Sequence, residues 1–162
     1  MTQCGSLHES SKDLPIHFFV PSDADSDWDN VLSYASSWWG SQIPGLVMSD
    51  GHSDDLVGKG HIKLNLVDVP VDQISDVGLT TYSWGSSCSM EDVSITINFI
   101  HPGKDEDHLN AGVVAHELGH ALGLAHDKDP QSMMYPGAHS APFVLEPETK
   151  AELVFMYDTI RP

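Results

Sequence analysis

The segment VVAHELGHALGLAHDKDPQSMMYP, residues 113–136, combines three histidines, one glutamate and a pair of methionines. His116 and His120 are four residues apart, so on a helix they lie on one face, one turn apart, and both imidazoles can reach one ion. Glu117 follows the first histidine and carries a carboxylate that can take a proton from metal-bound water. The spacing therefore predicts a metal-dependent catalytic centre on a helix.

A third histidine, His126, makes this pattern specific. On a continuous helix it would lie about 9 Å beyond His120 along the axis, too far to share an ion. Gly123 stands between them, and glycine readily adopts the left-handed conformation that ends a helix. We therefore expect the helix to break at Gly123 and the chain to turn back. Three neutral imidazoles with a fourth position open for water are typical of a catalytic zinc site.

The same segment also fits an amphipathic helix that carries histidines by chance. Its apolar residues would form a face that packs on the core, namely Val113, Val114, Leu118, Ala121 and Leu122. A bare H-E-x-x-H pattern does occur by accident. The glycine and the third histidine make accident a poor explanation, so we expect one face to pack on the core and the other to face a metal.

The composition restricts the class of protein. The chain has 162 residues, 40% of them hydrophobic, which suits one compact domain with a real core. Its formal charge of −17 disfavours nucleic acid and anionic membranes as partners. No membrane span is expected, because no run of eighteen apolar residues occurs. The N-terminus lacks the features of a signal peptide, so either the protein is not exported by that route or a leader has been removed.

Periodicity and turn residues predict an α+β domain with one sheet and three helices. Strands are expected at 16–20, 61–69, 78–84 and 93–100, and the polar strand 78–84 suits a sheet edge. A first helix is expected from about Trp28 to Gly40, with a cap near 23–27. A second is expected from about Leu109 to Leu122, with Asp105 or Asp107 as its cap. A third is expected over 147–158. Trp38 and Trp39 are expected in the core rather than in a binding site.

The stretch HELGHALGLAH, residues 116–126, resembles the metzincin signature of zinc peptidases, H-E-x-x-H-x-x-G-x-x-H. Met134, eight residues beyond His126, resembles the Met-turn residue that these enzymes place beneath the metal. The short interval, with its LGLAH and MYP context, is most similar to the matrixin branch, which includes matrix metalloproteinases and bacterial relatives. The motifs cover about residues 116–136, and the order of elements is compatible over most of the chain.

This resemblance implies a zinc-dependent endopeptidase that hydrolyses extended peptide or protein substrates through a zinc-bound water. By position, the resemblance implies that His116, His120 and His126 are ligands of one catalytic zinc and that Glu117 is the general base. Met134 would be a packing residue that does not ligate. Tyr135 and Pro136 would begin the wall of the pocket for the side chain just after the scissile bond. Strand 78–84 would be the edge along which substrate pairs by β-augmentation.

The resemblance also implies an overall arrangement. Residues 1–162 would form a single catalytic domain with one twisted mixed sheet of about five strands and three helices. The active-site cleft would lie between a larger N-terminal subdomain, about 1–123, and a smaller C-terminal subdomain, about 124–162. A secreted or extracellular monomer is favoured.

Some residues depart from the family pattern. Asp127 follows the third histidine, where animal matrixins usually have serine, although the spacing to Met134 still favours matrixins. The structural-zinc loop of the family is not evident. His52 and Asp54 form an H-x-D pair, but His61 follows too soon to complete a second zinc site.

Other candidate sites stay open at this point. Acidic runs at Asp23, Asp25 and Asp27 and at Asp105, Glu106 and Asp107 either bind calcium or are simply solvated, and neither matches an EF-hand loop. Cys4 and Cys88 either pair or do not, because pairing is a matter of geometry. Cys4 in QCG is either similar to the zinc-binding cysteine of matrixin pro-segments or part of a flexible tail.

Two other functions fit the same residues. One is a zinc-bound peptide-binding module without catalysis, and the other is a zinc hydrolase of a small non-peptide amide. Glu117 argues against the first, because a general base is the residue least needed for folding.

Overall fold

The computed structural model describes residues 16–43, 46, 48–54, 61–68, 77–84, 90–99, 107–137 and 144–158. Their elements are, in order, β1 (Ile16–Val20), α1 (Asp27–Gln42), β2 (Met48–His52), β3 (His61–Asp68), β4 (Gly78–Trp84), β5 (Met90–Phe99), α2 (Asp107–Ala121) and α3 (Pro147–Asp158). The described residues thus form a five-stranded sheet and three helices. The expected α+β fold class is confirmed.

The sheet is mixed, with the strand order β2-β1-β3-β5-β4. β1 pairs in parallel with β2 and with β3, and β3 pairs in parallel with β5. β4 pairs antiparallel with β5 and lies at the end of the sheet, as its polar sequence predicts. Among the described strands its outer side has no neighbour, which is the position of an edge strand.

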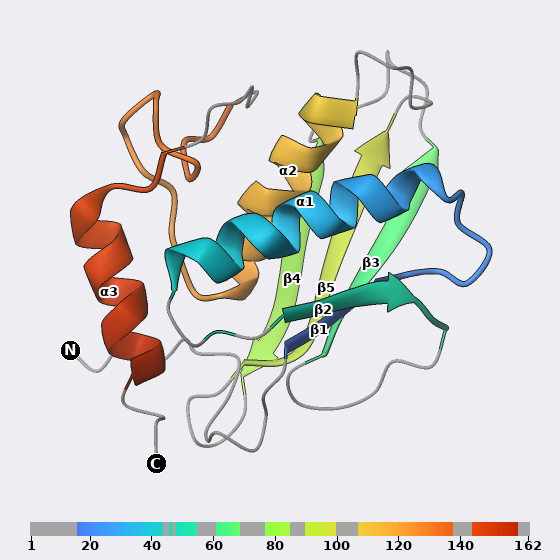
Figure 1. The fold of residues 1–162 in the computed structure, drawn as a ribbon, viewed down its shortest axis with the longest axis horizontal. Coiled ribbons are helices and arrows are strands. Elements are labelled where there is room, and N and C mark those ends of the chain that lie inside the picture. The colour runs from blue at the N-terminus through green and yellow to red at the C-terminus, as the bar shows by residue number, and fades with distance from the viewer. Residues whose placement is uncertain are drawn as a thin grey trace.

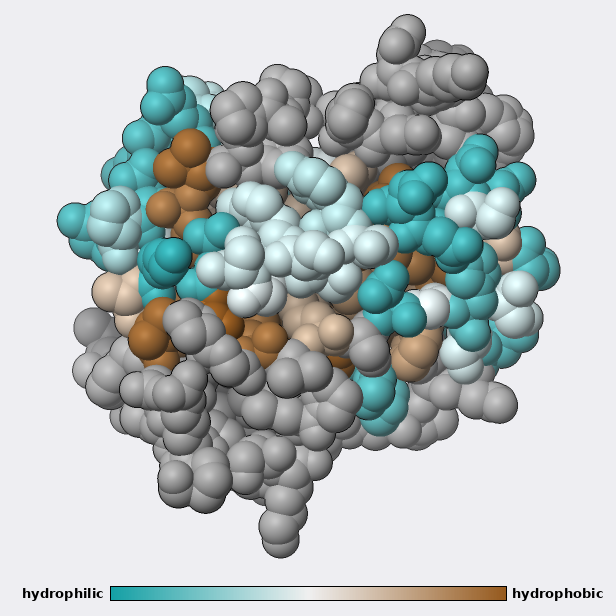
Figure 2. Space-filling view, viewed as in Figure 1, coloured by the Kyte–Doolittle hydropathy of each residue, from teal (hydrophilic) through white to brown (hydrophobic). Residues whose placement is uncertain are grey.

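Helices α1 and α2 lie side by side across one face of this sheet (Figure 1). Alternate residues of the central strands are buried beneath them, as expected for strands with one covered face: Ile62, Leu64, Val93, Ile95 and Ile97. The outer surface of α1 carries exposed polar residues, which form the pale band across the middle of Figure 2 and its teal continuation. The core therefore lies between the sheet and the two helices.

The C-terminal end of α1 differs from expectation. The helix continues through Gly40 to Gln42, so the prediction that Gly40 ends it is wrong. Ile43 is only 2% exposed, and its N–H donates to the carbonyl of Trp39 over 3.2 Å. The stabilisation from burying Ile43 thus outweighs the unfavourable helix propensity of Gly40, and the last turn forms.

Strand β2 was not expected from the sequence. Its residues, MSDGH, include no β-branched residue and no Phe, Tyr or Trp, so strand propensity gives no signal. All five pair in parallel register with β1, from Ile16↔Met48 to Val20↔His52. The buried neighbouring strand, rather than local preference, therefore determines this strand.

The other boundaries agree with expectation within a few residues. β1 and α3 have the predicted bounds, and α2 begins at Asp107. Trp39 is fully buried and Trp38 is half-buried, so the core assignment holds most fully for Trp39. In the described ranges no helix combines the length and the apolar character needed to cross a membrane.

Candidate metal centre

The C-terminal end of α2 has the geometry that turns the chain back. α2 ends at Ala121, and Gly123 has a φ of 104°, a left-handed conformation that favours glycine. The Gly123 N–H donates to the carbonyl of His120, and the Leu124 N–H donates to that of Gly119, each over 3.0 Å. These two bonds form a Schellman motif. The chain therefore leaves the helix axis at Gly123, three residues after His120.

This turn brings His126 back to the two histidines of α2. One ring nitrogen from each of His116, His120 and His126 lies within 4.8 Å of the others. The His126 ring centroid is 5.3 Å from that of His116 and 4.7 Å from that of His120. Within the described ranges this is the only group of three or more potential metal-ligand side chains.

Backbone carbonyls orient the two helical imidazoles. His116 Nδ1 is 2.7 Å from the Met133 carbonyl oxygen, and His120 Nδ1 is 2.8 Å from the Leu124 carbonyl oxygen. A carbonyl only accepts, so each Nδ1 carries the hydrogen and donates it. In the neutral ring, Nε2 is then the atom that carries a lone pair in place of a hydrogen. Carbonyls that hold ligand imidazoles in this way are usual around metal sites.

The two Nε2 atoms of His116 and His120 lie 3.2 Å apart. Two lone pairs at this separation repel each other unless a proton or a cation lies between them. Tetrahedral zinc, with Zn–N bonds of about 2.0–2.1 Å, holds its ligand nitrogens about 3.3–3.4 Å apart. The spacing and the tautomers therefore fit a bound metal ion.

The third imidazole, His126, favours its neutral form. Partial desolvation, followed by the neighbouring His120, lowers the pKa of His126, and these effects outweigh the Glu117 carboxylate, which raises it. A neutral imidazole is the form that binds a metal. The electrostatics of the cluster thus agree with its geometry.

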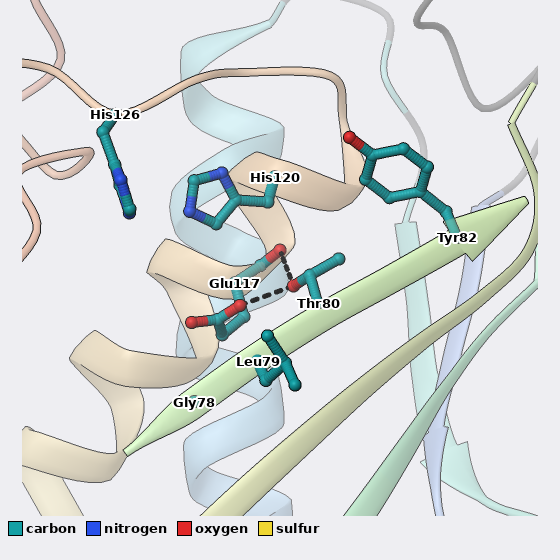
Figure 3. Close-up of a pocket in the computed structure, with 7 residues that line it drawn as sticks. All are labelled: Gly78, Leu79, Thr80, Tyr82, Glu117, His120 and His126. Atoms are coloured by element: carbon teal, nitrogen blue, oxygen red, sulfur yellow. Dashed lines mark hydrogen bonds between the residues drawn. The ribbon is translucent and has the colours of Figure 1, made fainter. Parts of the chain in front are cut away.

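Glu117 is buried, with 5% of its surface exposed, and its side chain extends from α2 toward β4 (Figure 3). The Thr80 hydroxyl lies 2.5 Å from Oε2 of Glu117 and 3.0 Å from its backbone carbonyl oxygen. A buried carboxylate is costly without polar partners, so Thr80 compensates part of its desolvation.

An open pocket of about 330 Å³ lies between α2 and β4. Two of the three histidines, the Glu117 carboxylate and the edge strand line it, namely Gly78, Leu79, Thr80, Tyr82, Glu117, His120 and His126 (Figure 3). Leu79 and Tyr82 are 53% and 42% exposed. Tyr135 and Pro136 do not line this pocket, and residues 138–143 lie outside the described part of the chain.

The segment after His126 folds beneath α2. The Asp127 N–H donates to the Met134 carbonyl over 2.8 Å, which closes a loop. Met134 is fully buried, and its sulfur occupies the space that a Cβ on Gly119 would fill. Met134 therefore packs directly under the turn of α2 that carries His120.

The residues of the second-zinc pattern have other partners. His52 Nε2 lies 2.7 Å from Asp29 Oδ1, and Asp54 accepts hydrogen bonds from the hydroxyl and the N–H of Ser22. His61 stacks on His17, with 5.2 Å between the ring centroids. The three residues of that pattern do not gather into a metal-ligand group.

The candidate calcium runs are only partly described. Asp25 Oδ1 accepts the N–H of Asp27 over 3.0 Å at the start of α1. Asp23, Asp25 and Asp27 do not form a metal-ligand group. Asp105, Glu106, Cys4 and Cys88 lie outside the described residues.

Sequence reasoning missed two kinds of contributor to the site. Thr80 and Gly78 contact Glu117 from a strand that lies more than thirty residues earlier, and no local pattern marks that contact. Met133 and Leu124 act through backbone carbonyls, which any residue type can supply. A signal was available only for the strand itself, which was predicted as a sheet edge.

Comparison with known proteins agrees with this geometry. The profile of the matrixin peptidase family matches residues 10–148. Matrix metalloproteinase-20 of Homo sapiens is 71% identical over 24 residues, which cover 15% of this chain and 5% of that protein, so the match spans a small part of the relative's length. The family match includes the histidine cluster and most of the sequence, and the chain belongs to the matrixin family of metallopeptidases.

Proposed function

We propose that this chain is a zinc-dependent endopeptidase that hydrolyses peptide bonds of protein substrates, with residues 1–162 acting as one catalytic domain. The observation that carries the proposal is the pair of Nε2 atoms on His116 and His120, 3.2 Å apart, with both Nδ1 atoms tied to carbonyls. The buried carboxylate of Glu117 lines the same pocket as His120 and His126. Two of the proposed ligands and the proposed base therefore line one pocket.

His116, His120 and His126 would hold the zinc. When bound, the ion supplies Lewis-acid chemistry, which polarises the scissile carbonyl and lowers the pKa of water. The carbonyls of Met133 and Leu124 keep two of the imidazoles in the tautomer whose Nε2 carries no hydrogen. Met134 would support the site by packing without ligating.

Glu117 would act as the general base. Its carboxylate takes a proton from the water that adds to the carbonyl carbon, and it later passes this proton to the nitrogen of the leaving amine. Cleavage of the C–N bond then yields a carboxylic acid and an amine. Glu117 follows His116 on α2 and lines the pocket between α2 and β4, where a scissile bond can reach it.

The substrate would be an extended peptide paired with the outer side of β4. Among the described strands β4 pairs with β5 alone, so its other side is suited to β-augmentation. Leu79 and Tyr82 would flank the peptide, while Tyr135 and Pro136 would begin the wall of the pocket for the side chain after the scissile bond. The cleft would divide an N-terminal subdomain, about 1–123, from a C-terminal one, about 124–162.

The test is Glu117→Ala, assayed on a denatured protein mixture and on a peptide library. We expect the variant to keep its zinc content and its circular dichroism spectrum but to lose cleavage. Cleavage by the wild-type chain should stop with a chelator and return with added zinc. An undiminished rate in Glu117→Ala would exclude this residue as the base.

The same assays separate the alternatives. Zinc binding without chelator-sensitive cleavage of any substrate would favour a zinc-bound peptide-binding module. Chelator-sensitive cleavage of small amides alone would favour a small-amide hydrolase.

A further inference from the structure

Strand β4 contacts the Glu117 side chain at two positions, Gly78 and Thr80. The two residues are separated by one position, so their alternating strand geometry directs them to the same face of the sheet. That face is the one covered by α2, and Figure 3 shows the carboxyl group of Glu117 next to both positions. The edge strand therefore forms a surface against which this carboxylate rests.

At Gly78 the surface has no side chain, and the carboxylate uses that space. A Cβ built there would lie 2.6 Å from Oε1 of Glu117, 2.8 Å from Cγ and 2.9 Å from Cδ. Such distances are far inside van der Waals contact, so alanine at this position would force the carboxylate to move. The φ of Gly78 is not left-handed, so backbone conformation does not require glycine here. The lack of a side chain is what the contact with Glu117 requires.

At Thr80 the surface supplies a hydrogen-bond donor. The hydroxyl carries one hydrogen, so it donates to one acceptor at a time, and the carboxylate oxygen Oε2 is closer than the backbone oxygen, at 2.5 Å against 3.0 Å. A donor to a charged oxygen gives a short and strong bond. The other oxygen, Oε1, points away from Thr80 (Figure 3).

We propose that Thr80 is a positioning residue for the general base. Its hydroxyl binds Oε2, and the space at Gly78 receives the carboxyl group, so Glu117 is held in one orientation with Oε1 directed away from the threonine. This inference rests on the proposed role of Glu117. The hydroxyl acts through its contact with Glu117.

A positioning role and a merely structural role predict different kinetics. A hydroxyl that only satisfies a buried carboxylate would affect folding stability and leave turnover unchanged. A hydroxyl that aims the carboxylate affects kcat and leaves KM unchanged, because peptide pairing with β4 uses its backbone. The kcat-against-KM comparison is therefore the informative measurement.

The experiment compares Thr80→Val, which is nearly isosteric, with Thr80→Ser, which keeps the hydroxyl. We expect Thr80→Val to lower kcat roughly 10- to 100-fold with KM and zinc content unchanged. Thr80→Ser should retain most of kcat. Thr96→Val is the matched control, because Thr96 lies on β5 between the buried Ile95 and Ile97 and so faces away from α2. Its kcat should equal that of the wild type.

Gly78→Ala is a second, independent arm. It leaves Thr80 intact but displaces the carboxylate, so kcat should fall here too while zinc content is unchanged. This arm keeps the proposal testable if Thr80→Val fails to fold.

Three results would overturn the inference. They are wild-type kcat in a folded Thr80→Val, wild-type kcat in Gly78→Ala, and equal losses in Thr80→Val and Thr80→Ser. If Glu117→Ala is inactive in the same series, the assignment of the base survives such a result. If Glu117→Ala is fully active, the proposed function itself fails.

Discussion

The indole Nε1–H of Trp39 donates a hydrogen bond of 2.8 Å to the backbone carbonyl of Ala115. Both residues are fully buried, and Ala115 immediately precedes His116. The bond joins α1 to α2 across a gap of 76 residues in the sequence. His116, the first histidine of the candidate metal centre, is therefore anchored from the neighbouring helix as well as by its own contact with Met133.

Replacing Trp39 with phenylalanine should test this anchor. The ring keeps most of its apolar volume, but the Ala115 carbonyl loses a buried donor, which costs about 1–3 kcal/mol of unfolding free energy. Urea unfolding measures the loss. Trp38→Phe, at the half-buried neighbour, should cost less. Equal losses in the two variants would show that the indole N–H has no special role.

The close contact between Gly119 and Met134 gives a second prediction. Alanine at Gly119 would bring its Cβ into the methionine sulfur and within 3.0 Å of the Trp39 ring, so overpacking should cost about 1–3 kcal/mol. Gly40→Ala is the control, since its Cβ would meet only the Leu46 carbonyl at 3.9 Å. Because alanine has a higher helix propensity than glycine, Gly40→Ala should be more stable than the wild type by about 0.5–1 kcal/mol. Thermal unfolding that shifts in the same direction for both variants would contradict the argument.

Gly123 gives a third prediction, which couples folding to metal affinity. At φ 104°, a Cβ adds strain of about 1–2 kcal/mol. Gly123→Ala should lower the unfolding free energy by that amount and weaken zinc binding, because His126 depends on this turn. Gly123→Asn should lose less, since asparagine tolerates left-handed backbone better. Competition with a fluorescent chelator measures zinc affinity, and unchanged affinity in Gly123→Ala would separate the turn from the site.

The sequence predicted those parts of the fold whose signals are local. IHFFV was predicted as a buried strand and forms β1, and Pro147 with its following acidic residue marked the start of α3. The turn at Gly123 was predictable because a third histidine cannot reach the ion along a continuous helix. β2 gave no such signal, because its pairing with β1 is a tertiary contact.

The limits of sequence reasoning at the site have the same cause. His116, Glu117 and His120 share one helix, so their spacing describes their geometry. The contact of Thr80 with Glu117 spans 37 residues and depends on how β4 is placed against α2. Gly40 shows the opposite error, because a local helix-ending signal was outweighed by burial of Ile43.

The pair His17 and His61, stacked on neighbouring strands, gives a prediction about pH. Burial, and then the nearby His61, lower the pKa of His17 from its ordinary value of 6.5. The unfolded chain then binds more protons than the folded one as the pH falls through 6.5, so stability should decrease in that window. His17→Phe keeps a flat ring beside Phe19 and removes the titrating group. Its urea midpoint should fall less than that of the wild type between about pH 7.5 and about pH 5.5.

Asp54 supplies the control for this pH experiment. Its hydrogen bonds from Ser22 lower the pKa of its carboxyl below the ordinary 3.8, so its contribution is present above that value and is lost only as the pH falls below it. Asp54→Asn should therefore lower the urea midpoint equally at both pH values. The change of its midpoint with pH should match that of the wild type. If the urea midpoint of His17→Phe falls with pH as steeply as that of Asp54→Asn, groups other than His17 cause the acid sensitivity.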